Sequence, residues 1–524
     1  MKSARRLPAP ARSVVIGVRA AAAMALAALL ASCGLLAPSD DGSKQKGSTG
    51  QADPSITEAA PAELRQYYGQ QVAWKPCEQQ FQCASVKVPL DYGNPSGDSI
   101  EIAALKLPAK GTKKGSLLVN PGGPGGSGYD FVKDSGATNI SERVRSNYDL
   151  VGFDPRGVKR SAPVTCLTDK ERDAAAQQNY NLDRDADLQA YLASNKATNA
   201  KCAEKTGPVL AHIDTVSAAK DLDILRAVVN DAKLNYLGYS YGTFLGSTYA
   251  SLFPDHVGHM VLDGALDPSL SNEELTRGQA RAFEKAIHAY VADCLRKEGC
   301  PLTGSVDNAV QQIRDLIQNE AAYPQRAKDG RLVTGSSFVS GFILPFYNDT
   351  NWPLLTQALD SAMKGDPTPM LQLADFGADR NPDGTYSSNS GFAFNAINCL
   401  DYPMVTDTAG MRAEEQLLLK DSPTLGYFFA YGGATCKDWP YKNVRTPAPV
   451  EYPGSAPIVV VGTTGDPATP VEWAEALRKQ LGNASLLTWK GEGHTAYGRS
   501  NSCIENAVDD YLVDGKKPVD NTMC

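Results

Sequence analysis

The sequence lacks several patterns by which metal-binding, nucleotide-binding and nucleic-acid-binding proteins are commonly identified. None of its 11 cysteines forms a CxxC pair, which excludes the usual zinc and thioredoxin patterns, and we expect no metal site and no cofactor. The glycine-rich stretch NPGGPGGSG is not followed by Gly-Lys-Ser/Thr, which excludes a Walker phosphate-binding loop. The net charge is −8, from 51 basic and 59 acidic residues. Because phosphate backbones are bound by basic surfaces, we expect no nucleic-acid partner.

The apolar run near the amino terminus, AAAAMALAALLAS, has about 13 residues and is too short to span a membrane as a stable helix. Five basic residues precede it, and it leads into Leu-Ala-Ser-Cys33, which resembles the lipobox of bacterial lipoproteins. We therefore expect residues 1–32 to be a signal peptide, Cys33 to be lipidated, and residues 33–65 to form a flexible linker. The protein would then be a lipoprotein on the outer face of the cell membrane, or extracellular after release. An ordinary cleaved signal peptide is the alternative.

Apart from Cys33, ten cysteines remain, and an even number in an exported chain indicates disulfide bonds. Ten cysteines allow about 945 pairings, so the sequence does not prove any one of them. They nevertheless fall into neighbouring pairs along the chain. We therefore predict the bridges Cys77–Cys83, Cys166–Cys202, Cys294–Cys300, Cys399–Cys436 and Cys503–Cys524.

Short apolar segments that alternate with helical patterns indicate an α/β fold with a mostly parallel sheet. Several segments are continuous runs of Val, Leu and Ile, as expected for strands that helices bury on both faces. We predict eight strands, over residues 85–88, 100–107, 116–120, 150–154, 235–239, 260–263, 458–462 and 485–489. Helical patterns replace the strand signals from about residue 270 to 445. We therefore expect a core formed by residues 66–270 and 446–524, interrupted by a large, mainly helical cap insertion over 271–445.

A lone serine stands at the junction of a predicted strand and a predicted helix, in Gly238-Tyr239-Ser240-Tyr241-Gly242. This is the arrangement of a nucleophile elbow, a tight turn that exposes a serine above a sheet. The alternative is a turn whose hydroxyl has no chemical role. A serine attacks a carbonyl group only when an imidazole takes its proton and a carboxylate orients that imidazole. The remainder of the chain therefore has to supply a histidine and an acid.

In α/β hydrolases the acid and the histidine follow the serine along the chain, each after a late strand. Of the five histidines, at positions 212, 256, 259, 288 and 494, only His494 follows a late predicted strand. Asp466 directly follows the predicted strand before it, although an aspartate before proline is also a common turn residue. The order of the three residues predicts Ser240 as nucleophile, Asp466 as acid and His494 as base.

Acyl transfer places negative charge on the carbonyl oxygen, and backbone N–H groups stabilise that charge in an oxyanion hole. The N–H of Tyr241, directly after the serine, is one predicted donor. The loop after the predicted strand 116–120 contains Gly122 and Gly123, which expose their N–H groups because they have no side chain. We therefore predict an oxyanion hole formed by Tyr241, Gly122 and Gly123.

Five motifs occur in order along the chain, NPGGPGGSG, VGFDPRGVKRS, YLGYSYGTFLG, DPATP and GEGHTAYG. Together they resemble the exported actinobacterial tripeptidyl-aminopeptidase-like serine peptidases, relatives of prolyl aminopeptidases with an α/β-hydrolase fold. The resemblance covers roughly residues 70–524. It implies that Ser240, Asp466 and His494 are the nucleophile, acid and base of this family.

The resemblance also concerns residues around the site. It implies that Asp154 and Arg156 form an internal ion pair in a structural turn, and that Thr469 supports the acid loop. The glycine-rich loop begins with Asn120-Pro121 where the prolyl enzymes have histidine and glycine. A preference for proline is therefore not implied.

These features predict a serine peptidase that cleaves near the amino terminus of peptide substrates through an acyl-enzyme. Such an exopeptidase needs an acceptor for the substrate's terminal ammonium group, and Asp401 is the candidate. Two other classes of protein fit part of the pattern. A carboxylesterase or lipase would use the same triad. A non-catalytic, lipid-anchored solute-binding protein would explain the lipobox but not the order of the triad.

Overall fold

The computed structural model describes residues 49–50 and 54–524. The predicted signal peptide, Cys33 and most of the predicted linker lie outside this part of the chain. The end of the predicted linker is helical, with α1 (Pro54–Ala59) and η1 (Ala62–Leu64) followed by α2 (Arg65–Tyr68). None of the helices in the described part is both long enough and apolar enough to cross a membrane.

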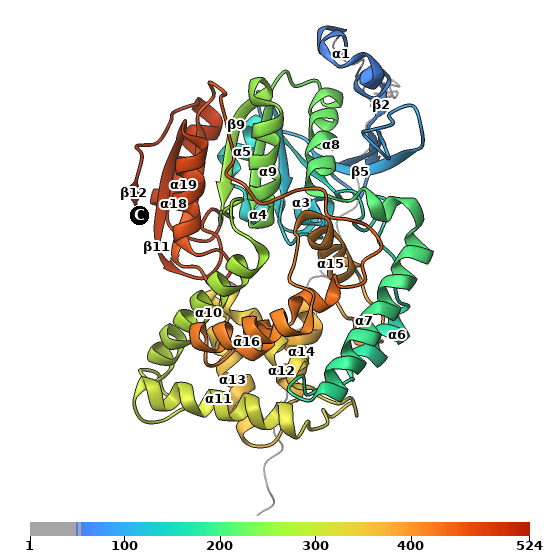
Figure 1. The fold of residues 1–524 in the computed structure, drawn as a ribbon. Helices are drawn as coiled ribbons and strands as arrows, with labels where there is room; N and C mark the ends of the chain where they lie inside the picture. The colour runs from blue at the N-terminus through green and yellow to red at the C-terminus, as the bar shows by residue number, and fades with distance from the viewer. Residues whose placement is uncertain (1–48, 51–53) are drawn as a thin grey trace, which may run out of the picture. The chain divides into compact units, whose positions relative to one another are not determined.

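A ten-stranded sheet forms the centre of the fold, in the order β12-β11-β10-β9-β8-β6-β7-β5-β4-β3 (Figure 1). Neighbouring strands from β7 across to β12 pair in parallel, whereas β3, β4, β5 and β7 pair antiparallel. The strands are β3 (Lys75–Cys77), β4 (Phe81–Pro89), β5 (Ser99–Leu107), β6 (Gly115–Asn120), β7 (Tyr148–Phe153), β8 (Leu234–Tyr239), β9 (Val257–Asp263), β10 (Ile458–Gly465), β11 (Ala484–Glu492) and β12 (Thr522–Met523). A separate two-stranded sheet pairs β1 (Thr49–Gly50) with β2 (Val72–Ala73).

All eight predicted strands are present, and the mostly parallel α/β fold is confirmed. The predicted number of strands in the main sheet is wrong, because β3 and β12 extend its two edges. These strands have only three and two residues. Segments that short show no recognisable alternation of apolar and polar residues.

Helices cover both faces of the sheet. Successive side chains of a strand point to opposite faces, so adjacent apolar residues of one strand pack against different helices. Leu118 of β6 lies in an apolar cluster with residues of α8 (Thr215–Val228), whereas the adjacent Leu117 lies in a cluster with residues of α19 (Ser502–Asp514). The first face is also covered by α9 (Tyr241–Leu252) and α18 (Val471–Leu481), and the second by α3 (Gly128–Asp134) and α5 (Glu142–Asn147). Every residue of β6 and β7 is buried as a result.

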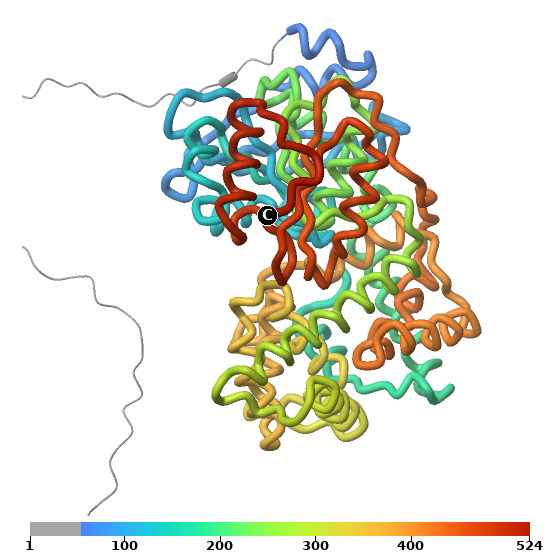
Figure 2. The backbone as a smooth tube through the Cα atoms, turned by 90° about the vertical axis from the view of Figure 1, so that its left-hand side faces the viewer, coloured from blue at the N-terminus to red at the C-terminus, as the bar shows by residue number. Residues whose placement is uncertain are grey.

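Between β9 and β10 the chain forms a helical layer, which we call the cap (residues 271–445; Figures 1 and 2). Its helices are α10 (Asn272–Cys294), α11 (Val306–Ala322), α12 (Gly335–Ile343), α13 (Trp352–Met363), α14 (Thr368–Gly377), α15 (Ser390–Asp401), α16 (Thr408–Asp421) and α17 (Gly426–Phe429). The cap has an apolar core of its own, which includes Phe283, Ile313, Phe338 and Phe346. This core is separate from the two apolar clusters on the faces of the sheet.

Three helices join the cap to the rest of the molecule. Helices α6 (Asp169–Ala176) and α7 (Asp185–Thr206), from the connection between β7 and α8, are bound to the cap by the ion pairs Arg380–Asp173 and Arg412–Asp185. Helix α15 belongs to the cap in sequence, but its buried residues Ala393, Ala396, Ile397 and Leu400 lie in an apolar cluster on the sheet.

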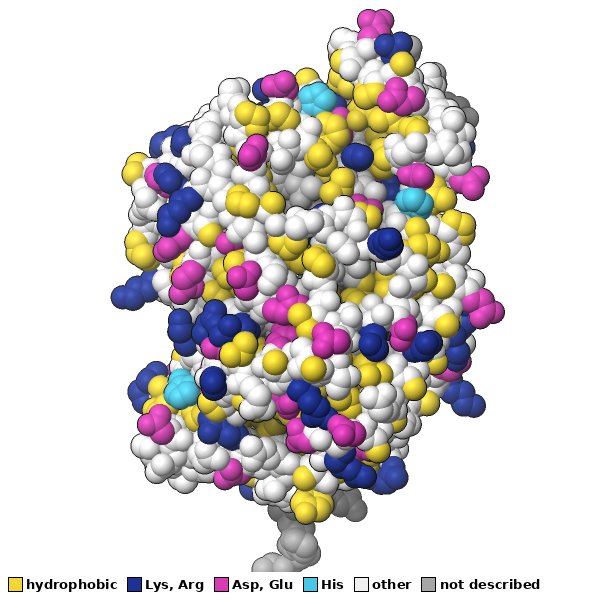
Figure 3. Space-filling view, in the orientation of Figure 1, with side chains coloured by type: hydrophobic (Ala, Val, Ile, Leu, Met, Phe, Trp, Pro, Cys, Tyr) yellow, Lys and Arg dark blue, Asp and Glu magenta, His cyan; other side chains and the backbone are white. Residues whose placement is uncertain are grey.

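The five predicted disulfide bonds are confirmed: Cys77–Cys83, Cys166–Cys202, Cys294–Cys300, Cys399–Cys436 and Cys503–Cys524. Each joins segments that are close in sequence, so the bridges reinforce local structure and do not connect distant parts of the chain. On the face shown in Figure 3, acidic and basic side chains are interspersed.

Candidate active site

Ser240 lies in the tight turn between β8 and α9, with φ +55° and ψ −125°. Its N–H donates a hydrogen bond to the carbonyl oxygen of Asp263 at 2.9 Å. The turn requires small residues on both sides. A Cβ atom at Gly238 would lie 2.4 Å from the carbonyl oxygen of Gly242, and a Cβ atom at Gly242 would lie 2.7 Å from that of Asn120. This is the geometry of a nucleophile elbow.

Asp466 and His494 are paired in the interior. Asp466 follows β10 and His494 follows β11, and Nδ1 of the histidine lies 2.9 and 3.0 Å from the two carboxylate oxygens. Asp466 also accepts hydrogen bonds from the N–H groups of Ala468, Thr469 and Thr495 and from Oγ1 of Thr469. The histidine's Nε2 is buried and has no hydrogen-bond partner among the described residues. The acid thus orients the imidazole through one nitrogen and leaves the other available.

Ser240 and His494 both contact the short turn Asp263-Gly264. The serine N–H bonds the carbonyl oxygen of Asp263, and a Cβ atom on the next residue, Gly264, would lie 3.1 Å from Cε1 of the imidazole. The carboxylate of Asp263 accepts hydrogen bonds from the N–H groups of Ala496 and Tyr497, just beyond the histidine. Burial raises the pKa of Asp263 to about 7. This residue ties the serine turn to the histidine loop, a role that the sequence analysis missed.

The other four histidines lie elsewhere and have structural partners. His256 pairs with Asp223, and Nδ1 of His259 faces the carbonyl oxygen of Leu512. His288 faces a carbonyl oxygen of its own helix, and His212 lies 3.9 Å from Asp91. Of the five histidines, His494 alone is bonded to Asp466.

The glycine-rich loop lies against the serine turn, but its two glycines differ. A Cβ atom at Gly122, whose φ is +99°, would lie 2.8 Å from the Cβ of Ser240 and 3.1 Å from the backbone N of Tyr241. The N–H of Gly122 already donates to Oδ1 of Asn120 at 2.9 Å, which argues against its predicted role as an oxyanion donor. No described residue accepts a hydrogen bond from the N–H of Gly123 or of Tyr241. Of the three predicted donors, Gly123 and Tyr241 are therefore the two whose N–H groups have no acceptor in the described part of the chain.

Asp401 does not lie where a substrate could reach it. Its side chain has no exposed surface, and its two oxygens accept hydrogen bonds from the N–H and Oγ1 of Thr215. Thr215 in turn bonds the hydroxyl group of Tyr241. The prediction that Asp401 accepts a substrate's ammonium group therefore has no support from its position. Its observed partners instead indicate that it stabilises the side chain that follows the serine.

Asp401 should affect the pH dependence of stability. Burial raises its pKa to about 7, whereas an unfolded aspartate ionises near about 3.9. Between these values the folded state keeps a proton that the unfolded state has lost. The contribution of Asp401 to the free energy of unfolding therefore falls as pH rises from about 4 to 7, by at most about 1.4 kcal/mol per pH unit.

Asp401→Asn removes this titration. We expect the difference in free energy of unfolding, wild type minus variant, to decrease from pH 4 to pH 7, as measured by urea unfolding at several pH values. The control is Asp98→Asn, which makes the same substitution at an exposed side chain. A constant difference for Asp401→Asn would contradict the prediction.

Asp154 and Arg156 form ion pairs, but not with each other as predicted. Asp154 binds Arg160 at 2.9 Å, and Arg156 binds both oxygens of Asp221 at 2.7 Å. Arg156 is fully buried and also donates to three backbone carbonyl oxygens. Both residues therefore stabilise the turn after β7, in agreement with their predicted structural role.

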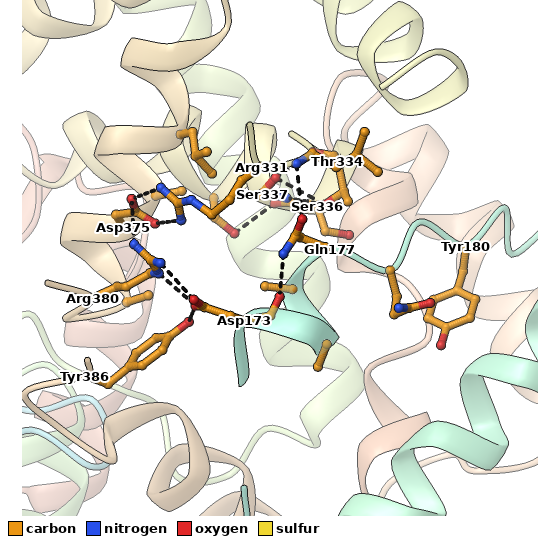
Figure 4. A pocket seen from close by; sticks show the side chains of 18 of the residues that line it. Asp173, Gln177, Tyr180, Arg331, Thr334, Ser336, Ser337, Asp375, Arg380 and Tyr386 are labelled. Atoms are coloured by element: carbon orange, nitrogen blue, oxygen red, sulfur yellow. Dashed lines mark hydrogen bonds and ion pairs between the residues drawn. The ribbon is translucent and has the colours of Figure 1, made fainter. Parts of the chain in front are cut away.

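A cavity of about 390 Å³ lies between the cap and the segment that contains α6 and α7 (Figure 4). Its charged groups neutralise one another. Arg331 is paired with Asp375, and Arg380 with Asp173, whose carboxylate also accepts a hydrogen bond from Tyr386. None of Ser240, Asp466 and His494 lines this cavity. Because these acidic and basic groups are paired with each other, they are not available for acid–base catalysis in this cavity.

Comparison with known proteins identifies the family of this chain. A family model described as TAP-like protein matches residues 422–524, the part that contains Asp466 and His494. The serine protease Hip1 of Mycobacterium tuberculosis is 38% identical over 480 residues, which cover 87% of this chain and 91% of that protein. Carboxylesterase B of Mycobacterium tuberculosis is 36% identical over 516 residues, covering 95% and 96%.

A third relative is the tripeptidyl aminopeptidase of Streptomyces lividans, which is 30% identical over 467 residues and covers 86% of each chain. Among solved structures, an epoxide hydrolase from an endophytic Streptomyces covers 85% of this chain and 100% of its own, with 13% identity and a TM-score of 0.36. The assignment rests on the sequence relatives, each of which spans most of both chains. The chain therefore belongs to the TAP-like family of α/β hydrolases.

Proposed function

We propose that this protein is an exported serine peptidase that hydrolyses peptide bonds near the amino terminus of its substrates. The observation that carries the proposal is the state of His494: Nδ1 is bound to Asp466, and the buried Nε2 is unpaired among the described residues. A ring held in this way accepts the proton of a serine hydroxyl. The relatives named serine protease Hip1 and tripeptidyl aminopeptidase support peptides as substrates.

The proposed reaction begins when Oγ of Ser240 attacks the scissile carbonyl carbon and His494 takes the hydroxyl proton. The N–H groups of Gly123 and Tyr241 stabilise the resulting oxyanion. His494 then donates its proton to the leaving amine, which departs and leaves an acyl group on the serine. A water molecule, deprotonated by His494, attacks this acyl-enzyme. The bond to Oγ of Ser240 then breaks, His494 returns the proton to Oγ, and the amino-terminal fragment leaves as a carboxylic acid.

Restriction to the amino-terminal end is proposed from the position of the cap. The start of α15 lies against the glycine-rich loop, since a Cβ atom at Gly125 would be 2.7 Å from the carbonyl oxygen of Ser390. A second cap segment contacts the histidine loop, since the N–H of His494 bonds the carbonyl oxygen of Tyr347. Cap segments therefore contact both the glycine-rich loop and the loop of the catalytic histidine. We propose that they close the site beyond a few substrate residues.

The test compares peptide arylamides that have a free amino terminus with the same peptides after acetylation. We expect acetylation to lower kcat/KM by about ten- to a hundredfold, because a charge-assisted hydrogen bond to the ammonium group contributes about 1.5–3 kcal/mol. Fragment masses followed over time from a defined longer peptide would show how many residues leave first. Equal cleavage of free and acetylated peptides, with cuts at internal bonds, would show an endopeptidase and contradict the proposal.

A carboxylesterase is the second candidate, because the relative named carboxylesterase B is 36% identical over most of the chain. The same triad cleaves esters, whose leaving groups depart more easily than amines. Parallel assays with peptide arylamides and short acyl esters separate the two functions. Strong ester hydrolysis without any amide cleavage would favour the esterase. Lipidation of Cys33 and attachment to the membrane remain predictions, since that residue lies outside the described part of the chain.

A further inference from the structure

The loop that carries the catalytic histidine is bound to the cap through its backbone. The N–H of His494 donates a hydrogen bond to the carbonyl oxygen of Tyr347 at 2.9 Å. The adjacent residues Asn348 and Gly493 form an antiparallel β-bridge. Gly493 has φ +97°, and a Cβ atom there would lie 3.0 Å from the same carbonyl oxygen. A glycine is thus required for the cap to approach the histidine this closely.

A side-chain contact lies beside this backbone contact. The rings of Tyr347 and His494 have centroids 5.4 Å apart and are perpendicular to each other. Edge-to-face packing at this distance is a favourable arrangement of two rings. The imidazole is therefore restrained from two directions, by Asp466 at Nδ1 and by the cap tyrosine against its ring.

An ion pair joins the same two segments. Arg499 binds Asp349 of the cap at 3.0 Å, and it also donates to the carbonyl oxygens of Glu492 and Thr495. These two carbonyl groups lie on either side of His494 in the sequence. One guanidinium group therefore holds both ends of the histidine loop and fixes them to the cap.

The cap side of this contact is continuous with the apolar core of the cap. Tyr347 is the last residue of η4 (Leu344–Tyr347), and its neighbour Phe346 is almost fully buried in the cap core. Phe346 packs edge-on against the rings of Phe283, Tyr290 and Phe342. Tyr347 is thus attached, through its neighbour Phe346, to the apolar core of the cap.

We infer that Tyr347 is a positioning residue for the catalytic base, and that the cap is part of the support of His494 as well as a cover over the site. This inference rests on the proposed roles of Ser240 and His494. An amine leaves only when the imidazole protonates it, whereas a nitrophenolate leaves without protonation. Loss of the tyrosine ring should therefore impair amide hydrolysis more than ester hydrolysis.

The experiment compares Tyr347→Ala with Tyr347→Phe, which keeps the ring. For Tyr347→Ala we expect kcat for a peptide arylamide to fall by ~10²-fold, with KM little changed, since acid–base catalysis contributes ~10²–10⁴. For a nitrophenyl ester we expect a loss of less than about tenfold, because only the proton-acceptor role of the imidazole is then required. Tyr347→Phe should remain close to the wild type. The matched control is Tyr323→Ala, which removes an exposed tyrosine from the cap surface.

Asp349→Asn provides a second variant, because it weakens the ion pair with Arg499 and leaves the tyrosine in place. It should reduce amide hydrolysis more than ester hydrolysis, as Tyr347→Ala does. Full activity of Tyr347→Ala on both substrates, or an equal loss on both with a lowered melting temperature, would overturn the inference. Ser240→Ala is measured alongside: if it remains active, the proposed function fails. If it is inactive while Tyr347→Ala is unimpaired, only the positioning role fails.

Discussion

Ser240→Ala is expected to lower kcat/KM for peptide arylamides by ~10⁴–10⁶. Without the hydroxyl group no acyl-enzyme forms, and only the oxyanion donors and substrate binding remain. The variant should fold normally, because alanine keeps the Cβ atom at this strained position and Oγ makes no hydrogen bond to any described residue. Initial rates with a peptide arylamide, together with a melting curve, test both statements.

Covalent labelling supplies the control for this prediction. A fluorophosphonate probe should modify the wild type and not Ser240→Ala, whereas Ser194→Ala, which changes an exposed serine in α7, should be labelled normally. Labelling that persists in Ser240→Ala would identify a different nucleophile. A wild type that is neither labelled nor active would instead favour a non-catalytic solute-binding protein.

Much of the fold could be predicted because its signals are local. Strands such as β6 and β10 contain continuous runs of Leu, Ile and Val, and the assignment of Ser240, Asp466 and His494 follows from the strands that precede them. The disulfide bonds were predictable for the same reason, since each joins neighbouring cysteines. The two edge strands were missed because they are short and depend on pairing with a neighbour.

The unpredicted parts of the site depend on tertiary contacts. The sequence does not show that Asp401, at the end of α15, is buried. In the structure its two carboxylate oxygens accept hydrogen bonds from Thr215 in the interior. The N–H of Gly122 is not free to bind a substrate, because it donates a hydrogen bond to the side chain of Asn120. This contact is not evident from the sequence. Tyr347 lies 494 − 347 = 147 residues from the histidine that it contacts, and no motif marks it.

Asp466→Asn is expected to lower kcat by ~10⁴ while KM changes little, because an amide fixes the wrong tautomer of the imidazole. Oδ1 of Asp466 accepts the N–H groups of Ala468 and Thr469, so an asparagine would place its oxygen there and turn its NH₂ group toward His494 and Thr495. Nδ1 of the histidine would then accept a hydrogen bond, and the proton would move to Nε2. A ring protonated at Nε2 cannot take the serine proton.

The same substitution places the asparagine NH₂ group opposite the N–H of Thr495, and two donors facing each other in the interior should cost about 1–3 kcal/mol of stability. Steady-state kinetics and urea unfolding measure the two effects separately, with Asp98→Asn as a control for the amide substitution. Activity within about tenfold of the wild type would show that Asp466 is not the acid. Asp263 would then be the next candidate, because it ends the adjacent strand β9 and its carboxylate binds the backbone just beyond His494.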